Sequence, residues 1–145
     1  MRALLQRVSR ASVRVEGELV GEIGQGLLVL LGMDRGDDIE IAERLLDKIL
    51  AYRVFADDRG RMNCSVVDVG GGVLLVSQFT LSADTRKGLR PGFSSAMPPD
   101  EARVLYDHTL AALAARHPDV ASGSFGAHME VSLTNDGPVT FLLES

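Results

Sequence analysis

Two short polar segments, distant in the chain, contain the residue types that could do chemistry. The first is Ser77-Gln78-Phe79-Thr80, directly after an apolar run that ends at Val76. A hydroxyl in such a place can attack a substrate when a base lies beside it. The second is Asn135-Asp136-Gly137-Pro138, whose glycine and proline are typical of a turn. Attack by a side chain of the first segment is therefore the first possibility to weigh.

Thr80 is the strongest candidate for a nucleophile, because it ends a strand beside a polar loop. A hydroxyl needs a base, and no Ser-His-Asp arrangement can be read from the order of the residues, although sequence distance does not exclude one in space. The alternative is that Ser77 and Thr80 use their hydroxyls to satisfy backbone groups at the end of the strand. The residues alone leave both interpretations open.

The remaining candidates for chemistry are weaker. Gly24-Gln25-Gly26 leads into a strand and lacks the third glycine of a dinucleotide-binding loop. Cys64 stands in a context that shows no sign of activation, and we expect a small buried residue there. The histidines lack the spacing of a metal site, so we expect surface or rim positions for His108, His117 and His128. The sequence predicts no metal site.

Apolar periodicity predicts the elements that would position the two polar segments. Met1 to Val15, Leu19 to Ile23 and Leu27 to Met33 are predicted as three strands of an antiparallel meander, with the third strand buried on both faces. Asp37 and Glu40 have the spacing of a capping box at the start of the first helix, whose apolar stripe runs to Leu50. Between the helices we predict a short strand over 62–67, a strand over 73–76 and a long functional loop over 82–98. A second helix is predicted from Pro99 to Pro118. Two strands follow, over 127–133 and 139–143, joined by a turn at 135–138. The fold class predicted is α+β, a single domain over residues 1–145 with a mixed, mainly antiparallel sheet and two main helices.

Size and charge limit the class of protein. The chain has 145 residues, of which 46% are apolar, and this is enough for one core. A net charge of −5 and a pI near 5.1 argue against a protein that coats nucleic acid through bulk electrostatics. A single cysteine, the lack of a leader and the lack of a membrane-spanning run predict a cytoplasmic protein. An RNA ligand would need a local basic patch, and the candidates are Arg2, Arg7, Arg10, Arg14, Arg86, Lys87 and Arg90. The residues alone favour the alternative, that these are ordinary solvated charges.

Further segments extend the two motifs into a resemblance that covers most of the chain. They are Gln6-Arg7-Val8 with Ala11-Ser12-Val13, the strand from Gly24 to Gly32, and the loop from Gly88 to Ser94. Taken with residues 77–81 and 135–141, they resemble the D-aminoacyl-tRNA deacylases, small enzymes that remove wrongly attached D-amino acids, and glycine, from tRNA.

The resemblance implies a homodimer, joined through the sheet, that hydrolyses the ester of D-aminoacyl-tRNA. Gly137-Pro138 matches the family's Gly-cisPro pair, which each subunit inserts into its partner's active site. A cis peptide would aim both carbonyl oxygens in nearly the same direction, as acceptors for the α-amino group of the substrate. The side chain of an L-residue would then collide with the wall of the site, whereas D-residues and glycine would fit.

The resemblance also implies that main-chain atoms and the 2′-hydroxyl of the terminal adenosine do the chemistry, without a cofactor. Backbone N–H groups near Phe79 and Thr80 would stabilise the oxyanion. Arg7 would hold the Gly-Pro loop, although it could be a surface arginine of a strand. Gln78 and Phe79 would line the pocket, with core packing as the alternative for Phe79.

The sequence thus predicts catalytic residues Ser77, Gln78, Phe79 and Thr80 and substrate-binding residues Arg7, Gly137 and Pro138. The partners expected are the 3′ acceptor end of aminoacyl-tRNA and a second copy of the chain, with no membrane and no DNA. Two alternatives stay open. One is a paralogue with a trans dipeptide that admits a small L-residue such as alanine. The other is a non-catalytic dimeric module that binds an amino-acid-like ligand or an RNA end without turnover.

Overall fold

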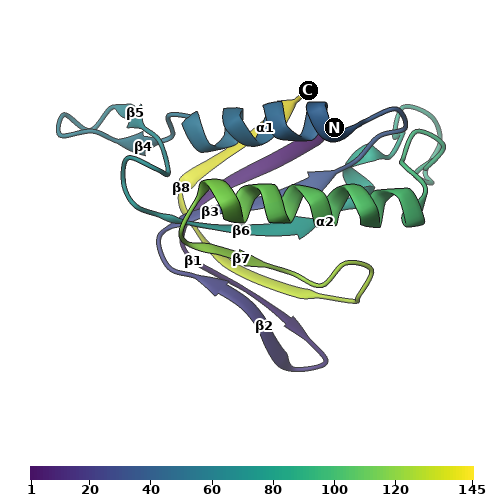
Figure 1. The fold of residues 1–145 in the computed structure, drawn as a ribbon, viewed down its shortest axis with the longest axis horizontal. Coiled ribbons are helices and arrows are strands. Elements are labelled where there is room, and N and C mark those ends of the chain that lie inside the picture. The colour runs from purple at the N-terminus through teal and green to yellow at the C-terminus, as the bar shows by residue number, and fades with distance from the viewer.

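Two helices cover one face of a strongly bent sheet in the computed structural model, which describes residues 1–145 (Figure 1). The elements in chain order are β1 (Arg2–Val15), β2 (Glu18–Ile23), β3 (Gly26–Gly32), α1 (Ile39–Ala51), β4 (Phe55–Ala56), β5 (Met62–Cys64), β6 (Gly72–Ser77), the 3₁₀ helix η1 (Phe79–Ser82), α2 (Pro99–Arg116), β7 (Val120–Ser122) and β8 (Glu130–Glu144). This arrangement confirms the α+β class with two main helices. Neither helix is both long and apolar enough to cross a bilayer.

The long strand β1 organises the sheet. Its first half pairs with β3 and its second half with β2, while β8 pairs with almost its whole length on the other side, all antiparallel. β6 then joins β3 in parallel, and β7 joins β6 in parallel. The sheet nearly closes, because β2 approaches β7 so tightly that a Cβ on Gly21 would overlap the backbone of Ser122.

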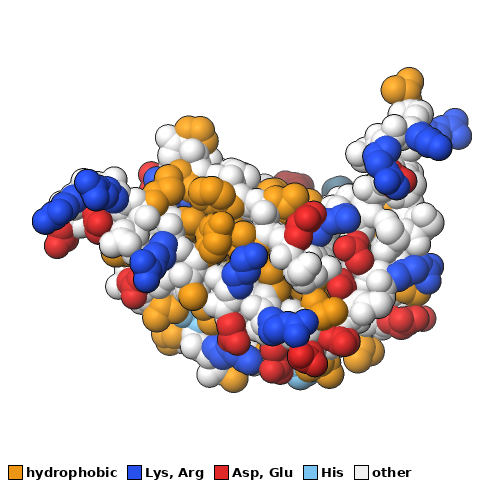
Figure 2. Space-filling view, turned by 90° about the horizontal axis from the view of Figure 1, so that it is seen from above, with side chains coloured by type: hydrophobic (Ala, Val, Ile, Leu, Met, Phe, Trp, Pro, Cys, Tyr) orange, Lys and Arg blue, Asp and Glu red, His pale blue; other side chains and the backbone are white.

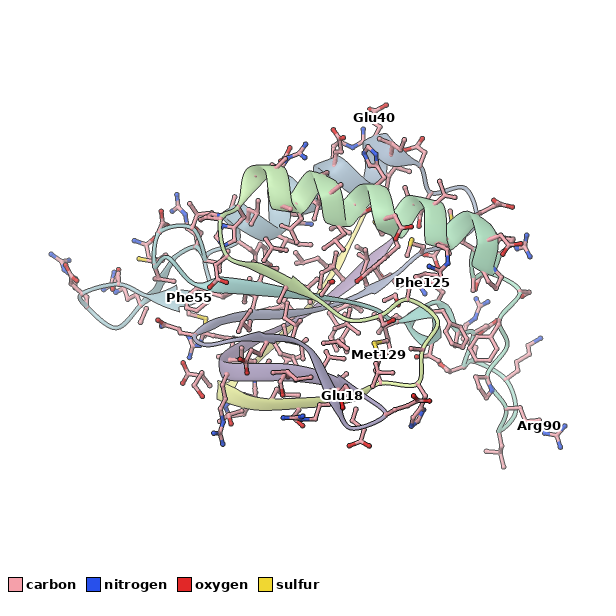
Figure 3. The ribbon with its side chains drawn as sticks, turned by 60° about the horizontal axis from the view of Figure 1, so that its bottom comes forward. Glu18, Glu40, Phe55, Arg90, Phe125 and Met129 are labelled. Carbon is pink, nitrogen blue, oxygen red and sulfur yellow. The ribbon has the colours of Figure 1, made fainter.

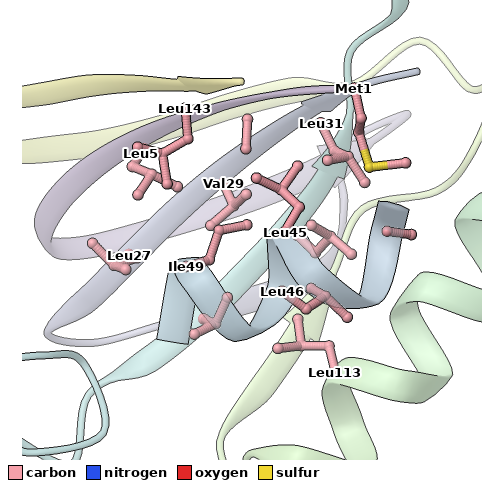
Figure 4. Packing of buried hydrophobic residues seen from close by; sticks show 14 of the residues in the cluster. Met1, Leu5, Leu27, Val29, Leu31, Leu45, Leu46, Ile49, Leu113 and Leu143 are labelled. Atoms are coloured by element: carbon pink, nitrogen blue, oxygen red, sulfur yellow. The ribbon is translucent and has the colours of Figure 1, made fainter. Parts of the chain in front are cut away.

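The main core lies between this sheet and the helices (Figure 4). β3 is buried on both faces as predicted, because Leu27, Val29 and Leu31 belong to the main core and Leu28 belongs to a second cluster. The predicted stripe of α1 is also buried, through Ala42, Leu45, Leu46, Ile49 and Leu50. A smaller cluster, which includes Val8, Leu28 and Leu74, fills the other side of the sheet.

Several predicted details of the fold are wrong. β3 pairs back with β1, so the first three strands do not form a simple meander. The cap of α1 is Asp38, whose carboxylate accepts from the N–H of Ile41, whereas Asp37 binds the N-terminal ammonium group at 2.8 Å. The short strand expected over 62–67 ends at Cys64, and neither β4 nor β7 was predicted.

The largest correction concerns residues 135–138, which do not form a turn between two strands. β8 runs from Glu130 to Glu144 as one strand, and β1 pairs with it on both sides of an irregularity. Gln6 faces Thr140 and Val8 faces Asn135, so four residues of β8 stand opposite one residue of β1. Residues 136–139 therefore form a wide bulge, which we call the β8 bulge.

Candidate functional site

A cavity of about 660 Å³ opens beside the carboxyl ends of β3 and β6. It is lined by 19 residues, of which 12 are hydrophobic, and Ser77, Gln78 and Phe79 of the first polar segment are among them. Phe125 and Met129, from the segment between β7 and β8, also line the cavity (Figure 3). The cavity is thus an apolar receptacle with polar groups at one edge, which is the usual composition of a small-ligand site.

Phe79 stands at the mouth of this cavity. Its side chain is 60% exposed, so core packing, the alternative that the sequence left open, is wrong. Its ring packs against Phe93 with a centroid distance of 5.1 Å. The pair offers an exposed aromatic surface on which a flat group such as a base could stack.

The hydroxyls and amides of the first polar segment have few partners. Thr80 Oγ1 accepts from the side-chain amide of Gln78, and neither Thr80 nor Ser77 bonds a backbone group through its hydroxyl. The main-chain N–H groups of Phe79 and Thr80 begin η1 and donate to no other part of the chain. Two donors are therefore free, one on Phe79 in the cavity lining and one on Thr80, which follows it in the chain and is not itself a lining residue.

The β8 bulge is held by a dense set of hydrogen bonds. The amide of Asn135 donates to the carbonyl oxygens of Arg7 and Val139, each at 2.9 Å, and its Oδ1 accepts from the N–H of Val139 at 3.1 Å. One side chain thus ties both ends of the bulge to each other and to β1. The peptide bond between Gly137 and Pro138 is cis, and both residues are exposed and have no partner on β1.

Arg7 supports the bulge from the strand opposite. Its Nε donates to the carbonyl oxygen of Asp136 at 2.9 Å, and its Nη1 donates to that of Val54 at 2.7 Å. The side chain is only 14% exposed, so it is not a free surface arginine. A planar guanidinium reaches two carbonyls that lie apart from donors on separate nitrogens, whereas a lysine ammonium offers its three donors from a single atom.

The two predicted groups of site residues lie apart within one chain. Arg7, beside the bulge, faces Leu27 near the start of β3, whereas Ser77 faces Leu31 at its end. Four residues of strand correspond to about 13 Å. Arg7, Gly137 and Pro138 do not line the cavity. A single chain therefore carries a cavity at one end of the sheet and an exposed bulge towards the other.

Sequence reasoning missed several features around the site. Phe93 and Phe125 lie in irregular segments, where no periodicity marks them as cavity residues. His117 was expected at the surface and is 4% exposed, because its Nε2 bonds the carbonyl oxygen of Gly71 at 2.7 Å at the end of α2. Cys64 is half-buried against the main core. No group of three or more His, Cys, Asp or Glu side chains is arranged to hold a metal ion.

Comparisons with known proteins agree over the whole chain. The family described as D-Tyr-tRNA(Tyr) deacylase matches residues 4–144. Proteins named D-aminoacyl-tRNA deacylase from Stutzerimonas stutzeri and Azotobacter vinelandii are 62% and 61% identical over 145 residues, which is 100% of each chain.

Two solved structures have the same fold. One, described as "c-Myc DNA Unwinding Element Binding Protein", has a TM-score of 0.95 and 44% identity, and the match covers 100% of this chain and 99% of that one. The other, described as a probable eukaryotic D-amino acid tRNA deacylase, has a TM-score of 0.80 and 19% identity, covering 98% and 97% of the two chains.

Proposed function

The chain belongs to the D-aminoacyl-tRNA deacylase family of hydrolases, and on that premise we propose that it removes D-amino acids, and glycine, from the 3′ end of tRNA while sparing L-aminoacyl-tRNA. The family confirms the resemblance seen in the sequence and supports hydrolysis of the D-aminoacyl ester. The single observation that carries the finer proposal is the separation of a free, rigidly supported β8 bulge from an apolar cavity that it cannot reach.

The separation is the reason for proposing a homodimer. The Gly137-Pro138 pair of one copy would enter the cavity of the second copy, so that each site takes residues from both chains. β8 supports this arrangement, because it is an edge strand with exposed apolar side chains that include Leu133, Phe141 and Leu142. Such an edge is normally covered by another chain or another element.

In this composite site, recognition of the substrate rests on main-chain atoms. The exposed carbonyl oxygens of Gly137 and Pro138 would accept from the α-amino group, and the N–H groups of Phe79 and Thr80 would donate to the oxygen of the scissile carbonyl. With both groups fixed, the chirality at Cα decides where the side chain points. A D-residue, or the hydrogen of glycine, would extend into free space, and an L side chain would meet the wall.

Hydrolysis then needs no side-chain nucleophile. The free 2′-hydroxyl of the terminal adenosine would orient the attacking water, and each oxyanion donor would lower the barrier by about 3 kcal/mol. Phe79 and Phe93 would hold the adenine at the mouth of the cavity. Because the substrate is charged tRNA, we place the reaction in the cytoplasm.

The decisive experiment follows the release of amino acid from D-tyrosyl-tRNA, L-tyrosyl-tRNA, glycyl-tRNA and L-alanyl-tRNA by catalytic amounts of the protein, with a chelator present. We expect turnover of the D and glycyl esters and stability of both L esters. Hydrolysis of L-alanyl-tRNA would indicate a wider pocket, as in the paralogue with a trans dipeptide. Saturable binding without release would indicate a non-catalytic module instead.

A further inference from the structure

An arm of residues 84–92 projects from the body of the molecule between η1 and α2 (Figure 2). We propose that this arm is an RNA-binding element that contacts the phosphate backbone of the acceptor stem while the 3′ end occupies the cavity. The inference rests on the proposed function, since it concerns the same substrate. It assigns binding to Lys87 and Arg90, not to the arginines near the N-terminus.

The arm has a fixed base. Two hydrogen bonds close it, from the N–H of Asp84 to the oxygen of Gly92 at 2.8 Å and in the reverse direction at 3.0 Å. Arg86 donates to both carboxylate oxygens of Asp84 at 2.9 Å, and its backbone N–H adds a third bond. These bonds hold the pKa of Asp84 well below its ordinary value, so the pair stays ionised.

The cations beyond this base are free. Lys87 and Arg90 are exposed and take part in none of the ion pairs of the chain, and Arg90 points into solvent at the far end of the arm (Figure 3). Leu89 lies at the tip with its side chain fully exposed. The arm carries three cations against one carboxylate in a chain whose net charge is −5. Such a local excess of positive charge fits a polyanion.

The N-terminal arginines are engaged elsewhere. Arg2 donates to the oxygen of Leu81 and lies near the carboxylates of Asp34 and Glu144, and Arg7 supports the β8 bulge. Arg10 and Arg14 are exposed, but they lie on the second half of β1, where Arg14 faces Glu130 on β8 and Arg10 lines a small pocket with Glu22. None of these four offers a free cation beside the cavity.

The arm lies close to the proposed binding site of the terminal adenosine. Phe93 directly follows the arm, lines the cavity and packs on Phe79. Lys87 and Arg90 are therefore only a few residues from the proposed adenosine site in the chain. The groove between α1 and α2 is acidic instead, with Asp38, Glu40, Glu43 and Glu101 along it. A nucleic acid would be repelled from the groove and attracted to the arm.

The test measures the affinity of the full-length protein for a stem-loop RNA that ends in a single-stranded 3′ adenosine, at several salt concentrations. The K87A/R90A variant should bind about tenfold more weakly or worse at 50 mM salt. Loss of two phosphate contacts should also reduce the slope of log affinity against log salt by about 2, so that the defect shrinks by about tenfold between 50 and 200 mM. The charge-preserving K87R/R90K variant should bind like the wild type.

The matched control is R44A/K48A, which removes two exposed cations from the outer face of α1 and should leave the affinity unchanged. An unchanged affinity or salt slope in K87A/R90A would overturn the role of the arm. So would equal losses in K87A/R90A and in the control.

Hydrolysis gives a second readout with the 3′-O-D-tyrosyl ester of adenosine, which has no phosphate. K87A/R90A should hydrolyse this ester at the wild-type rate but D-tyrosyl-tRNA with a raised KM. A loss on both substrates would contradict the proposal. If the wild type hydrolysed neither substrate, the proposed function would fail, while the RNA affinities would still decide for or against the arm.

Discussion

The cavity edge at residues 77–80 and the β8 bulge differ in how tightly each is held. The edge has unpartnered N–H groups, a Thr80 hydroxyl bonded only to the side-chain amide of Gln78, and an exposed phenylalanine. The bulge has Asn135 bonded at three points and Arg7 bonded at two. One region is open to a ligand, and the other is fixed before any ligand arrives.

This difference indicates a division of labour between the two regions. A group that rejects the wrong stereoisomer must not adapt to it, so it gains from a rigid support. A group that receives a reacting carbonyl needs free donors, which would be satisfied internally if they were not used. The bulge therefore suits discrimination, and the cavity edge suits chemistry. Changes in the two regions should then have different signatures.

The largest effect should come from Gly137→Ala. A Cβ at this position would overlap the backbone nitrogen and the side chain of Val139, so the bulge would have to move. A displacement of about 1 Å in a positioning group can lower the rate by about 100-fold, and we expect at least that loss in kcat/KM for D-tyrosyl-tRNA. Steady-state kinetics on the D and L substrates measure it.

Gly24→Ala is the control for this substitution. Nothing lies within 4 Å of a Cβ at Gly24, so activity should be unchanged. If Gly137→Ala kept full activity and full chiral discrimination, the bulge would have no part in the site. A size-exclusion profile like that of the wild type would show that any loss does not come from a failure to assemble.

A smaller effect is expected from Asn135→Ala. The substitution leaves the N–H of Val139 and two carbonyl oxygens without their partner, at a cost of about 2 kcal/mol in stability. The bulge would loosen without a steric clash, so we expect about a tenfold loss of kcat/KM together with measurable hydrolysis of the L substrate. Asn63→Ala, which removes surface contacts to Arg53 and Asp57 outside the bulge, should do neither.

Both regions of this comparison could be located from the sequence, because the residues of each motif are consecutive in the chain. The strand into Ser77 and the helix α1 follow from local periodicity, which reports the burial of neighbouring residues directly. The bulge could not be predicted as such. A Gly-Pro pair between two apolar stretches has the pattern of a turn, and only β1, about 130 residues away, shows that both stretches belong to one strand.

The cavity wall was unpredictable for a similar reason. Phe93 and Phe125 reach the cavity from loops whose course is set by contacts distant in sequence, such as the bridge between Asp34 and Ala96. His117 was misplaced because a polar residue at a helix end is usually exposed, and its partner Gly71 lies 46 residues away. Pairing partners and cavity walls are long-range properties, whereas motifs and stripes are local.

Thr80→Val should have a much smaller effect than either change in the bulge. The valine keeps the shape of the side chain and removes the hydroxyl, which bonds only Gln78, while the backbone N–H stays in place. We expect kcat within about threefold of the wild type if main-chain groups carry the chemistry. A loss of about 10⁶-fold, the scale seen when a catalytic nucleophile is removed, would show instead that Thr80 attacks the ester. Single-turnover kinetics separate this from a change in product release.

The smallest effect should come from the contact of Glu43 on α1 with His108 and Arg116 on α2, which lies outside both regions and serves as their reference. A hydrogen bond with His108, and then the charge and the hydrogen bond of Arg116, lower the pKa of Glu43 below its ordinary value of 4.5. A carboxylate with a lowered pKa in the folded state stabilises the protein above its unfolded pKa, and this contribution disappears as the pH falls through the folded value. The Tm of the wild type should therefore fall as the pH drops below about 4.5, and in Glu43→Gln it should start slightly lower and fall less over that range. Because Glu43 is exposed and its pairs are screened, the difference should be small, with kcat/KM unchanged at pH 7.

Glu40→Gln, which removes an exposed pair with Arg44 on the same helix, is the control and should leave the pH dependence of Tm as it is in the wild type. If Glu43→Gln altered the D to L ratio of hydrolysis, the helices would be coupled to the site, and the division between a fixed bulge and an open cavity edge would no longer be sufficient.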